Sequence, residues 1–142
     1  MSPETIHASA VAINGRAVLI MGPSGAGKSD LALRLIDRGA MLVSDDYIMV
    51  RQSAGLILAE PPATITGLIE VRGLGIVSMP YVSQVPVALV VSLESAIERM
   101  PERGRTRGIA GIEVPEVAND PREPTAPIKV ELALRRLLNG II

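Results

Sequence analysis

Residues 17–29 read AVLIMGPSGAGKS, an apolar run that leads directly into a glycine-rich loop. The loop, at residues 22–29, matches the P-loop pattern G-x-x-x-x-G-K-[ST] at every fixed position. Glycines let consecutive backbone N–H groups converge on phosphate oxygens at the start of a helix. We expect Lys28 to neutralise the β and γ phosphates of a nucleotide and Ser29 to place its hydroxyl on Mg²⁺. The expected nucleotide-binding residues are Gly22, Pro23, Ser24, Gly25, Ala26, Gly27, Lys28, Ser29 and Asp30.

The residues before the loop predict a hairpin. Residues 10–21 are two apolar runs separated by Asn14-Gly15, the dipeptide that most readily forms a type I′ turn. The second run is apolar throughout, as a strand buried on both faces would be.

The residues after the loop predict a helix and a further strand. Between Lys28 and Arg38 apolar residues recur at helical spacing, and Gly39 is the natural C-cap. AMLVSDD, at residues 40–46, is short enough for a strand and ends in two carboxylates. Strand, loop, helix and strand form a βαβ unit, so we expect an α/β fold with parallel strands joined by a right-handed crossover.

Composition limits the kinds of protein this can be. The 142 residues have room for one domain, and with 48% hydrophobic residues but no Trp or Phe the core must be aliphatic. A net charge of -1 gives no general reason to bind nucleic acid or an anionic membrane, so we expect neither. There is no cysteine, no apolar run long enough to span a bilayer and no signal-peptide pattern, which together predict a cytoplasmic protein.

The middle of the chain has more β than α character. Residues 49–51 and 56–59 flank QSAG as a hairpin, 68–71 is a short strand, and 85–93 is a strong buried strand. Residues 94–100 could form a short helix stopped by Pro101.

The last third divides into a loop and a helix. Residues 101–127 hold five of the eleven prolines together with RGRTRG, so we expect this stretch to be rich in loops and partly mobile. Val130, Leu134, Leu137 and Leu138 then form a helical stripe. That helix should end at Gly140, with Glu131 placed to pair with Arg135.

Asp45 and Asp46 lie at the carboxyl end of the second predicted strand, where open α/β sheets bind ligands. Adjacent residues of a strand point to opposite sides, so only one of them can easily face a γ phosphate unless the strand has already turned. One could serve Mg²⁺ and the other an incoming nucleophile. The alternative is a solvated acidic turn.

Three further features are ambiguous when each is taken alone. EVRGLGI, at residues 70–76, could simply be a strand with a flexible end. His7, the only histidine, is more often a surface or core residue than a catalytic one. The arginines between residues 99 and 107 would ordinarily be solvated, although phosphoryl transfer often recruits an arginine from a mobile loop.

Taken together and in order, these motifs resemble the catalytic domain of HPr kinase/phosphorylase, a family that phosphorylates a serine of the phosphocarrier protein HPr. The family order of histidine, P-loop, paired aspartates and E-[IV]-R-G-L-G-I here reads His7, GPSGAGKS, VSDD and EVRGLGI. The resemblance implies a short form that consists of the C-terminal catalytic domain. It also implies a P-loop kinase domain in residues 1–142, with a mixed β-sheet, flanking helices and a βαβ nucleotide-binding unit.

The resemblance also implies roles for individual residues. Ser29, Asp45 and Glu70 would serve the Mg²⁺ shell, and Asp46 would be the base that receives the serine proton and the acid in the reverse reaction. His7 would sit beside the phosphates and Asp46. Arg99 would be the arginine that stabilises the transition state.

The leading hypothesis is therefore an ATP- and Mg²⁺-dependent protein serine kinase that acts on an HPr-type phosphocarrier, with reverse phosphorylase activity and a homo-oligomeric assembly as further family properties. Two alternatives are a P-loop kinase for a small molecule and a nucleotide-sensing module without catalysis. An intact Asp46 and Glu70 argue against the sensor, because a sensor needs the loop but not a base.

Overall fold

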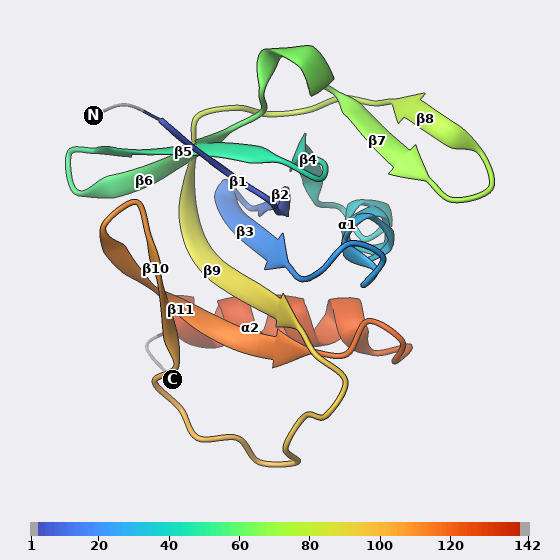
Figure 1. The fold of residues 1–142 in the computed structure, drawn as a ribbon. Helices are drawn as coiled ribbons and strands as arrows, with labels where there is room; N and C mark the ends of the chain where they lie inside the picture. The colour runs from blue at the N-terminus through green and yellow to red at the C-terminus, as the bar shows by residue number, and fades with distance from the viewer. Residues whose placement is uncertain (1–2, 140–142) are drawn as a thin grey trace.

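The computed structural model describes residues 3–139, and a mixed β-sheet forms the centre of this part of the chain (Figure 1). Nine strands belong to the sheet, and the main path through it runs β1-β5-β6-β9-β3-β2-β4, with β11 added beside β9 and β10 beside β11. Their bounds are β1 Glu4–Ile6, β2 Ser9–Ile13, β3 Arg16–Met21, β4 Met41–Ser44, β5 Ile48–Ser53, β6 Leu56–Glu60, β9 Val85–Leu93, β10 Thr106–Ile109 and β11 Ile112–Asn119.

Two helices, a small second sheet and one helical turn complete the described fold. The two α-helices are α1, Lys28–Asp37, and α2, Ala126–Leu138. A separate hairpin of β7, Leu68–Val71, and β8, Gly75–Ser78, follows the 3-10 turn Ala63–Ile65. Among the described residues, no helix is both long enough and apolar enough to cross a bilayer. The mixed sheet with flanking helices confirms the predicted α/β class.

The predicted hairpin before the P-loop is confirmed. β2 and β3 pair antiparallel, and Asn14 and Gly15 between them both have positive φ, 51° and 78°. These are the dihedrals that a type I′ turn requires and that Asn-Gly adopts with little strain. The hairpin delivers the chain to the P-loop at the carboxyl end of β3.

The strand–helix–strand unit forms, with one strand inserted into it. β2 pairs antiparallel with both β3 and β4, so β3 and β4 run in the same direction without being neighbours. The parallel neighbour of β3 is β9, which is in turn parallel to β11. Because β2 folds back from the hairpin, it takes the place beside β3 that a simple βαβ unit gives to its second strand.

α1 ends as its sequence predicts. Gly39, at φ +111°, follows the last turn, and the N–H groups of Gly39 and Ala40 donate to Ile36 O and Leu35 O. This is a Schellman motif, in which a residue with positive φ directs the chain out of the helix. The chain then enters β4.

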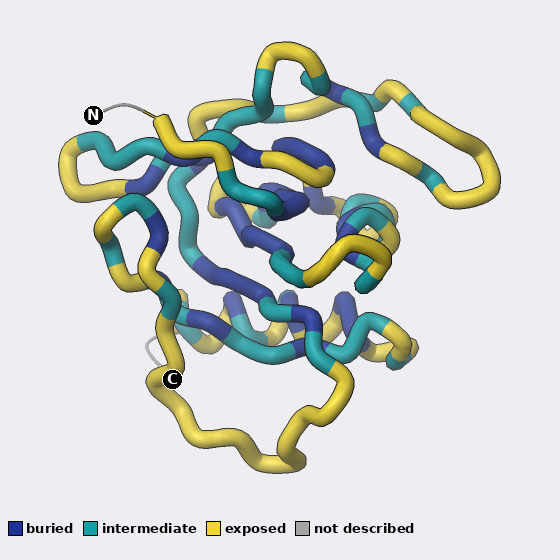
Figure 2. Tube along the Cα trace, in the orientation of Figure 1, coloured by how far each residue is buried: buried dark blue, intermediate teal, exposed yellow. Residues whose placement is uncertain are grey.

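The core is aliphatic, as predicted, and lies on both faces of the sheet. Figure 2 shows β3 as buried along most of its length, and alternate residues of this strand serve the two faces. Val18 and Ile20 pack with Leu31 of α1 and Leu134 of α2. On the other face, Leu19 packs among residues of the strands that fold over it.

Two predictions for the segment after β9 were wrong. Residues 94–100 form no helix; Ile97 and Met100 are exposed, so no apolar face holds so short a segment against the core. Within the stretch expected to be loop, residues 106–119 form the β10–β11 hairpin. Pro115 is tolerated there because the pairing of β11 with β9 begins only at the next residue, Glu116.

The C-terminal helix is confirmed, with a different ion pair from the one expected. Glu131 accepts hydrogen bonds from Arg38, at the end of α1, with Arg38 Nη2 2.8 Å from Glu131 Oε1. This contact, which raises the pKa of Arg38, ties α2 to α1. The predicted end of the helix at Gly140 lies outside the described residues, and α2 is followed through its C-cap, Asn139.

Candidate active site

The P-loop connects β3 to α1, and its glycines are needed for two different reasons. Gly25 and Gly27 have φ of +81° and +107°, which a residue with a side chain rarely adopts. Gly22 has an ordinary φ, but a Cβ at this position would lie 3.1 Å from Leu93 Cβ, on the neighbouring strand β9. The loop is therefore packed against β9 where it begins, and it turns sharply where it enters the helix.

Lys28 is the first residue of α1 and is buried, with 6% of its surface exposed. Its Nζ donates to the carbonyl oxygens of Gly22, at 2.8 Å, and Pro23, at 3.1 Å. Burial of an ammonium group is costly unless polar groups surround it, and here the loop supplies them. The positive charge is thus held inside the curve of the loop.

Asp45 joins three parts of the chain. Its Oδ1 accepts hydrogen bonds from Ser29 Oγ at 2.6 Å and from Ser9 Oγ at 2.8 Å, and its Oδ2 accepts one from the Glu70 N–H at 2.9 Å. The carboxylate is nearly buried. The expected meeting of the P-loop serine with an aspartate after β4 therefore occurs, and the residue before Asp45 is already the last of the strand.

The chain turns between the two aspartates, so they need not point to opposite sides of a strand. Asp46 has φ +67°, in the left-handed region, and its N–H donates to Ser9 Oγ at 3.0 Å. Its side chain is exposed, and Oδ1 lies 2.8 Å from His7 Nε2. The His7 ring stacks on Tyr47, with the ring centroids 5.1 Å apart. One aspartate is thus fixed and buried while its neighbour is accessible.

Ser9 is the site residue that the sequence analysis missed. It is fully buried, donates to Asp45 and accepts from the backbone of Asp46, so a single hydroxyl sets the positions of both acids. Its only sequence signal is a polar residue at the start of an apolar strand, two positions after the lone histidine. Such a serine is common in proteins that have no site at all.

Glu70 and Arg99 are placed less directly. Glu70 lies on β7 and reaches Asp45 through its backbone N–H, while its side chain is exposed. Arg99 lies in the exposed segment between β9 and β10, and within residues 3–139 no hydrogen bond or ion pair joins it to the P-loop or to the two aspartates. Their predicted roles stay predictions.

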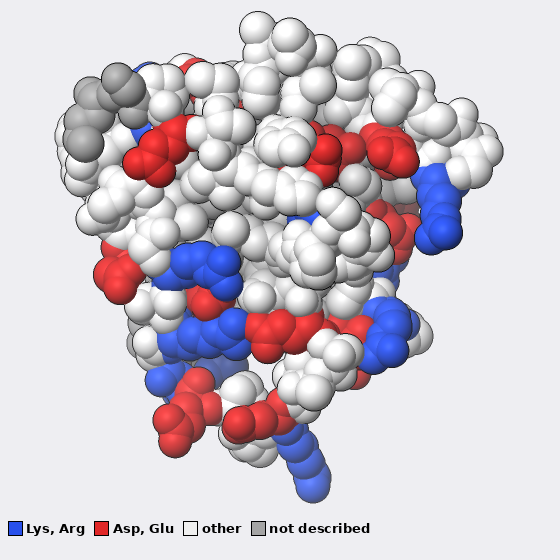
Figure 3. All heavy atoms as spheres, viewed as in Figure 1, with Lys and Arg blue, Asp and Glu red and all other residues white. Residues whose placement is uncertain are grey.

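A charged cluster lies near the start of the P-loop. The nearly buried Glu116 pairs with Arg105 and Arg107, and Arg107 Nη1 lies 3.8 Å from the sulfur of Met21, the last residue of β3. Arg105 also pairs with Glu94, and this hydrogen bond lowers the pKa of the Glu94 carboxyl. Figure 3 shows blue and red side chains alternating over the lower half of this face. In this cluster the two arginines are paired with the two glutamates.

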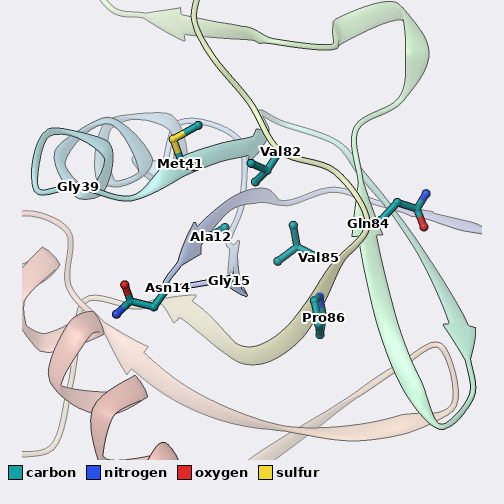
Figure 4. Close-up of a pocket in the computed structure, with 9 residues that line it drawn as sticks. All are labelled: Ala12, Asn14, Gly15, Gly39, Met41, Val82, Gln84, Val85 and Pro86. Carbon is teal, nitrogen blue, oxygen red and sulfur yellow. The ribbon is translucent and has the colours of Figure 1, made fainter.

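An open hollow of about 450 Å³ lies at the other end of β2 and β3 (Figure 4). It is lined by the turn residues Asn14 and Gly15, by Gly39 after α1 and by apolar residues near the start of β9. None of its lining side chains is ionisable, so it offers no charge to a phosphate. The hollow also lies away from the P-loop and the two aspartates, which follow β3 and β4 at their carboxyl ends.

Comparison with known proteins identifies the family. A family model described as the HPr Serine kinase C-terminal domain matches residues 1–122. The chain belongs to this family. HPr kinase/phosphorylase of Clostridium novyi is 34% identical to this HPr serine kinase C-terminal domain over 138 residues, which are 91% of this chain and 44% of the relative. The corresponding protein of Clostridium tetani is 43% identical over 81 residues, which are 56% of this chain and 27% of the relative.

A solved structure shows the same fold. The Hpr(Ser) kinase/phosphatase from Coxiella burnetii matches with a TM-score of 0.83 and 32% identity, covering 97% of this chain and 92% of that one. The HPr serine kinase C-terminal domain described here spans less than half the length of the curated relatives named above.

Proposed function

We propose that this domain is an ATP-dependent protein serine kinase that transfers the γ-phosphoryl group to a serine of an HPr-type phosphocarrier in the cytoplasm. We further propose that residues 1–142 form one catalytic domain. The observation that carries the proposal is the pair of contacts that brings Asp45 onto Ser29 of the P-loop and His7 onto Asp46. The names of the relatives support the choice of acceptor.

The residues at the end of the P-loop fit a magnesium nucleotide. No group of three or more His, Cys, Asp or Glu in the described range could hold a metal ion on its own. That agrees with a kinase site, because Mg²⁺ usually takes one or two carboxylates and completes its octahedron with substrate phosphates and water. Ser29 and Asp45 would hold it. Glu70 lies beside them, because its backbone N–H donates to Asp45 Oδ2. The bound ion would neutralise phosphate charge.

Lys28 and the loop would hold the phosphates. The Nζ that now donates to two loop carbonyls can donate to phosphate oxygens instead, since its charge already lies within the curve of the loop. The N–H groups of the loop and of the first turn of α1 would supply further donors.

Asp46 would act as the general base. As the acceptor serine forms its bond to the γ phosphorus and the bond from that phosphorus to the leaving ADP oxygen breaks, the serine proton passes to the Asp46 carboxylate. His7 orients this carboxylate through the 2.8 Å contact and is itself positioned by stacking on Tyr47. In the reverse phosphorylase reaction the same carboxyl would return the proton to the serine oxygen. We retain Arg99 as the arginine that would approach the transferred group.

The β7–β8 hairpin supports a homo-oligomer. Leu74 and Ile76 are 80% and 65% exposed there, in the EVRGLGI segment whose first residue contacts Asp45. Neighbouring exposed apolar side chains can form part of a patch that contacts another protein chain. We propose that a second copy of the domain covers them.

The test is phosphoryl transfer with a matched pair of variants. The domain would be incubated with γ-labelled ATP, Mg²⁺ and the HPr-type carriers of the same cell, and any labelled residue mapped. Asp46→Asn removes the proposed base, and Asp37→Asn removes an exposed carboxylate at the end of α1. Label on a carrier serine that is lost only in Asp46→Asn supports the proposal. ATP binding without any labelled carrier would favour a small-molecule kinase or a nucleotide sensor.

A further inference from the structure

The order of the strands indicates how a nucleotide would be oriented on the P-loop. At the carboxyl end of the sheet the strands run β11-β9-β3-β2-β4, and the P-loop leaves β3 in the middle. Asp45 and Asp46 follow β4, on one side of the loop. Because the reacting γ phosphate must face these acids, the nucleoside end has to lie on the opposite side, toward β9 and β11.

The segment between β11 and α2 occupies that opposite side. We call residues 120–125 the β11–α2 loop. It contacts the P-loop directly, because a Cβ at Gly27 would lie 3.4 Å from Pro121 Cγ. Arg34 of α1 donates to the carbonyl oxygens of Pro121 and Glu123. The β11–α2 loop is therefore held against the P-loop and α1 (Figure 1).

The two ends of the β11–α2 loop are also fixed. The buried Asn119, at the end of β11, donates from Nδ2 to Ala126 O at 3.0 Å, which joins the last strand to the first residue of α2. Lys129 Nζ lies 2.7 Å from Glu123 Oε1. A loop held at both ends and in the middle can serve as a rigid wall for a ligand.

Arg122 presents a flat cationic group on this wall. Its Nε and Nη2 donate to the two carboxylate oxygens of Asp120, at 3.0 and 2.8 Å, and its backbone N–H donates to Oδ1 at 3.0 Å. Two parallel bonds fix the plane of the guanidinium. They hold the pKa of Asp120 at about 2, so the pair stays ionised at any physiological pH. The Arg122 side chain is nevertheless 74% exposed, which leaves the guanidinium accessible.

In the described part of the chain, no aromatic ring lies on the nucleoside side of the site. The sequence has no Trp or Phe. His7 and Tyr47 stack on each other beside Asp46, and Tyr81 forms a bridge with Leu42 of β4, so all three rings lie on the β4 side. A purine base that extends from the P-loop toward the β11–α2 loop would find the exposed Arg122 guanidinium there, a planar cation that stacks well on aromatic faces.

We infer that the β11–α2 loop forms the nucleoside wall of the site and that the Arg122 guanidinium, held flat by Asp120, stacks on the base of the nucleotide. This inference rests on the proposed nucleotide-dependent function. It adds to that function the part of the site that would distinguish a nucleotide from inorganic phosphates.

The test compares two ligands that share a diphosphate. Dissociation constants for ADP and for inorganic pyrophosphate would be measured by calorimetry, with Mg²⁺, for the unaltered domain and for Arg122→Ala and Arg122→Lys. Arg16→Ala is the matched control, because Arg16 is an exposed arginine at the opposite end of β3. We expect Arg122→Ala to weaken ADP roughly five- to twentyfold, as the loss of a stacked cation does, and pyrophosphate less than about twofold. Arg122→Lys should resemble Arg122→Ala, and Arg16→Ala should change neither ligand.

The other possible results distinguish failure of this inference from failure of the proposed function. Unchanged ADP binding in Arg122→Ala, equal weakening of both ligands, or full rescue by Arg122→Lys would overturn the inference, since the last two indicate charge rather than stacking. Failure of the unaltered domain to bind ADP would overturn the proposed function and this inference together. If no carrier is phosphorylated but ADP binding depends on Arg122 as expected, the kinase proposal fails and the inference stands.

Discussion

Ser29 Oγ lies 2.6 Å from Asp45 Oδ1, so the first turn of α1 and the end of β4 are joined through the two residues that we propose hold a metal ion. The same carboxylate oxygen accepts from the buried Ser9 on β2, the strand inserted between β3 and β4. The inserted strand therefore does more than fill the sheet. It supplies the hydroxyl that positions Asp45 and, through the Asp46 N–H, its neighbour.

The two aspartates should separate stability from catalysis. Asp45 is nearly buried and accepts three hydrogen bonds, so Asp45→Asn should lower the free energy of unfolding by about 1–3 kcal/mol. Asp46 is exposed, and Asp46→Asn should change stability by less than about 0.5 kcal/mol while abolishing transfer. Urea unfolding followed by circular dichroism is the measurement, since the chain has no tryptophan. Equal losses of stability in the two variants would contradict the distinction.

Lys28 should matter for binding more than for folding. Lys28→Met keeps the apolar stem but removes the charge whose Nζ now donates to Gly22 O and Pro23 O. Hydrogen bonds to charged groups contribute about 1.5–3 kcal/mol, so ADP binding should weaken about ten- to hundredfold. Calorimetric titration would measure this, with Arg16→Met as the control for loss of a positive charge. Nucleotide affinity that survives Lys28→Met would show that the loop does not bind phosphate as proposed.

Features that depend on local interactions could be predicted from the sequence. Asn14-Gly15 and the P-loop glycines specify their own backbone dihedrals, so the hairpin and the loop could be predicted where they stand. The meeting of Ser29 with Asp45 could be expected as well, because both follow strands that end at the same edge of the sheet.

Features that depend on distant partners were not predictable. Ser9 acquires its role only because β2 inserts beside β4. The β10–β11 hairpin is held by pairing with β9, which outweighs the local signals of Pro115 and the nearby glycines. For residues 94–100 the local pattern suggested a helix, and no apolar partner was there to stabilise it.

Two hairpin turns offer a route to a more stable domain. Ala54 and Ala110 have positive φ, 51° and 48°, each followed by a glycine at positive φ, as Asn14 is. Alanine in the left-handed region costs about 1–2 kcal/mol, whereas asparagine adopts it readily in type I′ turns.

Ala54→Asn and Ala110→Asn should therefore each raise the free energy of unfolding by about 0.5–1 kcal/mol. Asn14→Ala, the reverse change in an equivalent turn, should lower it by a similar amount. Thermal and urea unfolding would measure all three. A stabilising Asn14→Ala would show that positive φ is not what decides stability in these turns.

The Asp120–Arg122 pair predicts a pH dependence whose sign follows from its geometry. Arg122 lowers the pKa of Asp120 to about 2 in the folded state, whereas an unfolded aspartate titrates near about 3.9. The pair therefore contributes stability above about pH 4 and loses that contribution as the pH falls through about 2. In Arg122→Ala the pKa of Asp120 should return toward its ordinary value. Carboxyl carbon shifts followed by NMR across this range would show the two midpoints, and identical midpoints would contradict the pairing.

Between pH 6 and 8 Asp120 stays ionised in both proteins, so any difference in ADP affinity there reports the loss of the guanidinium itself.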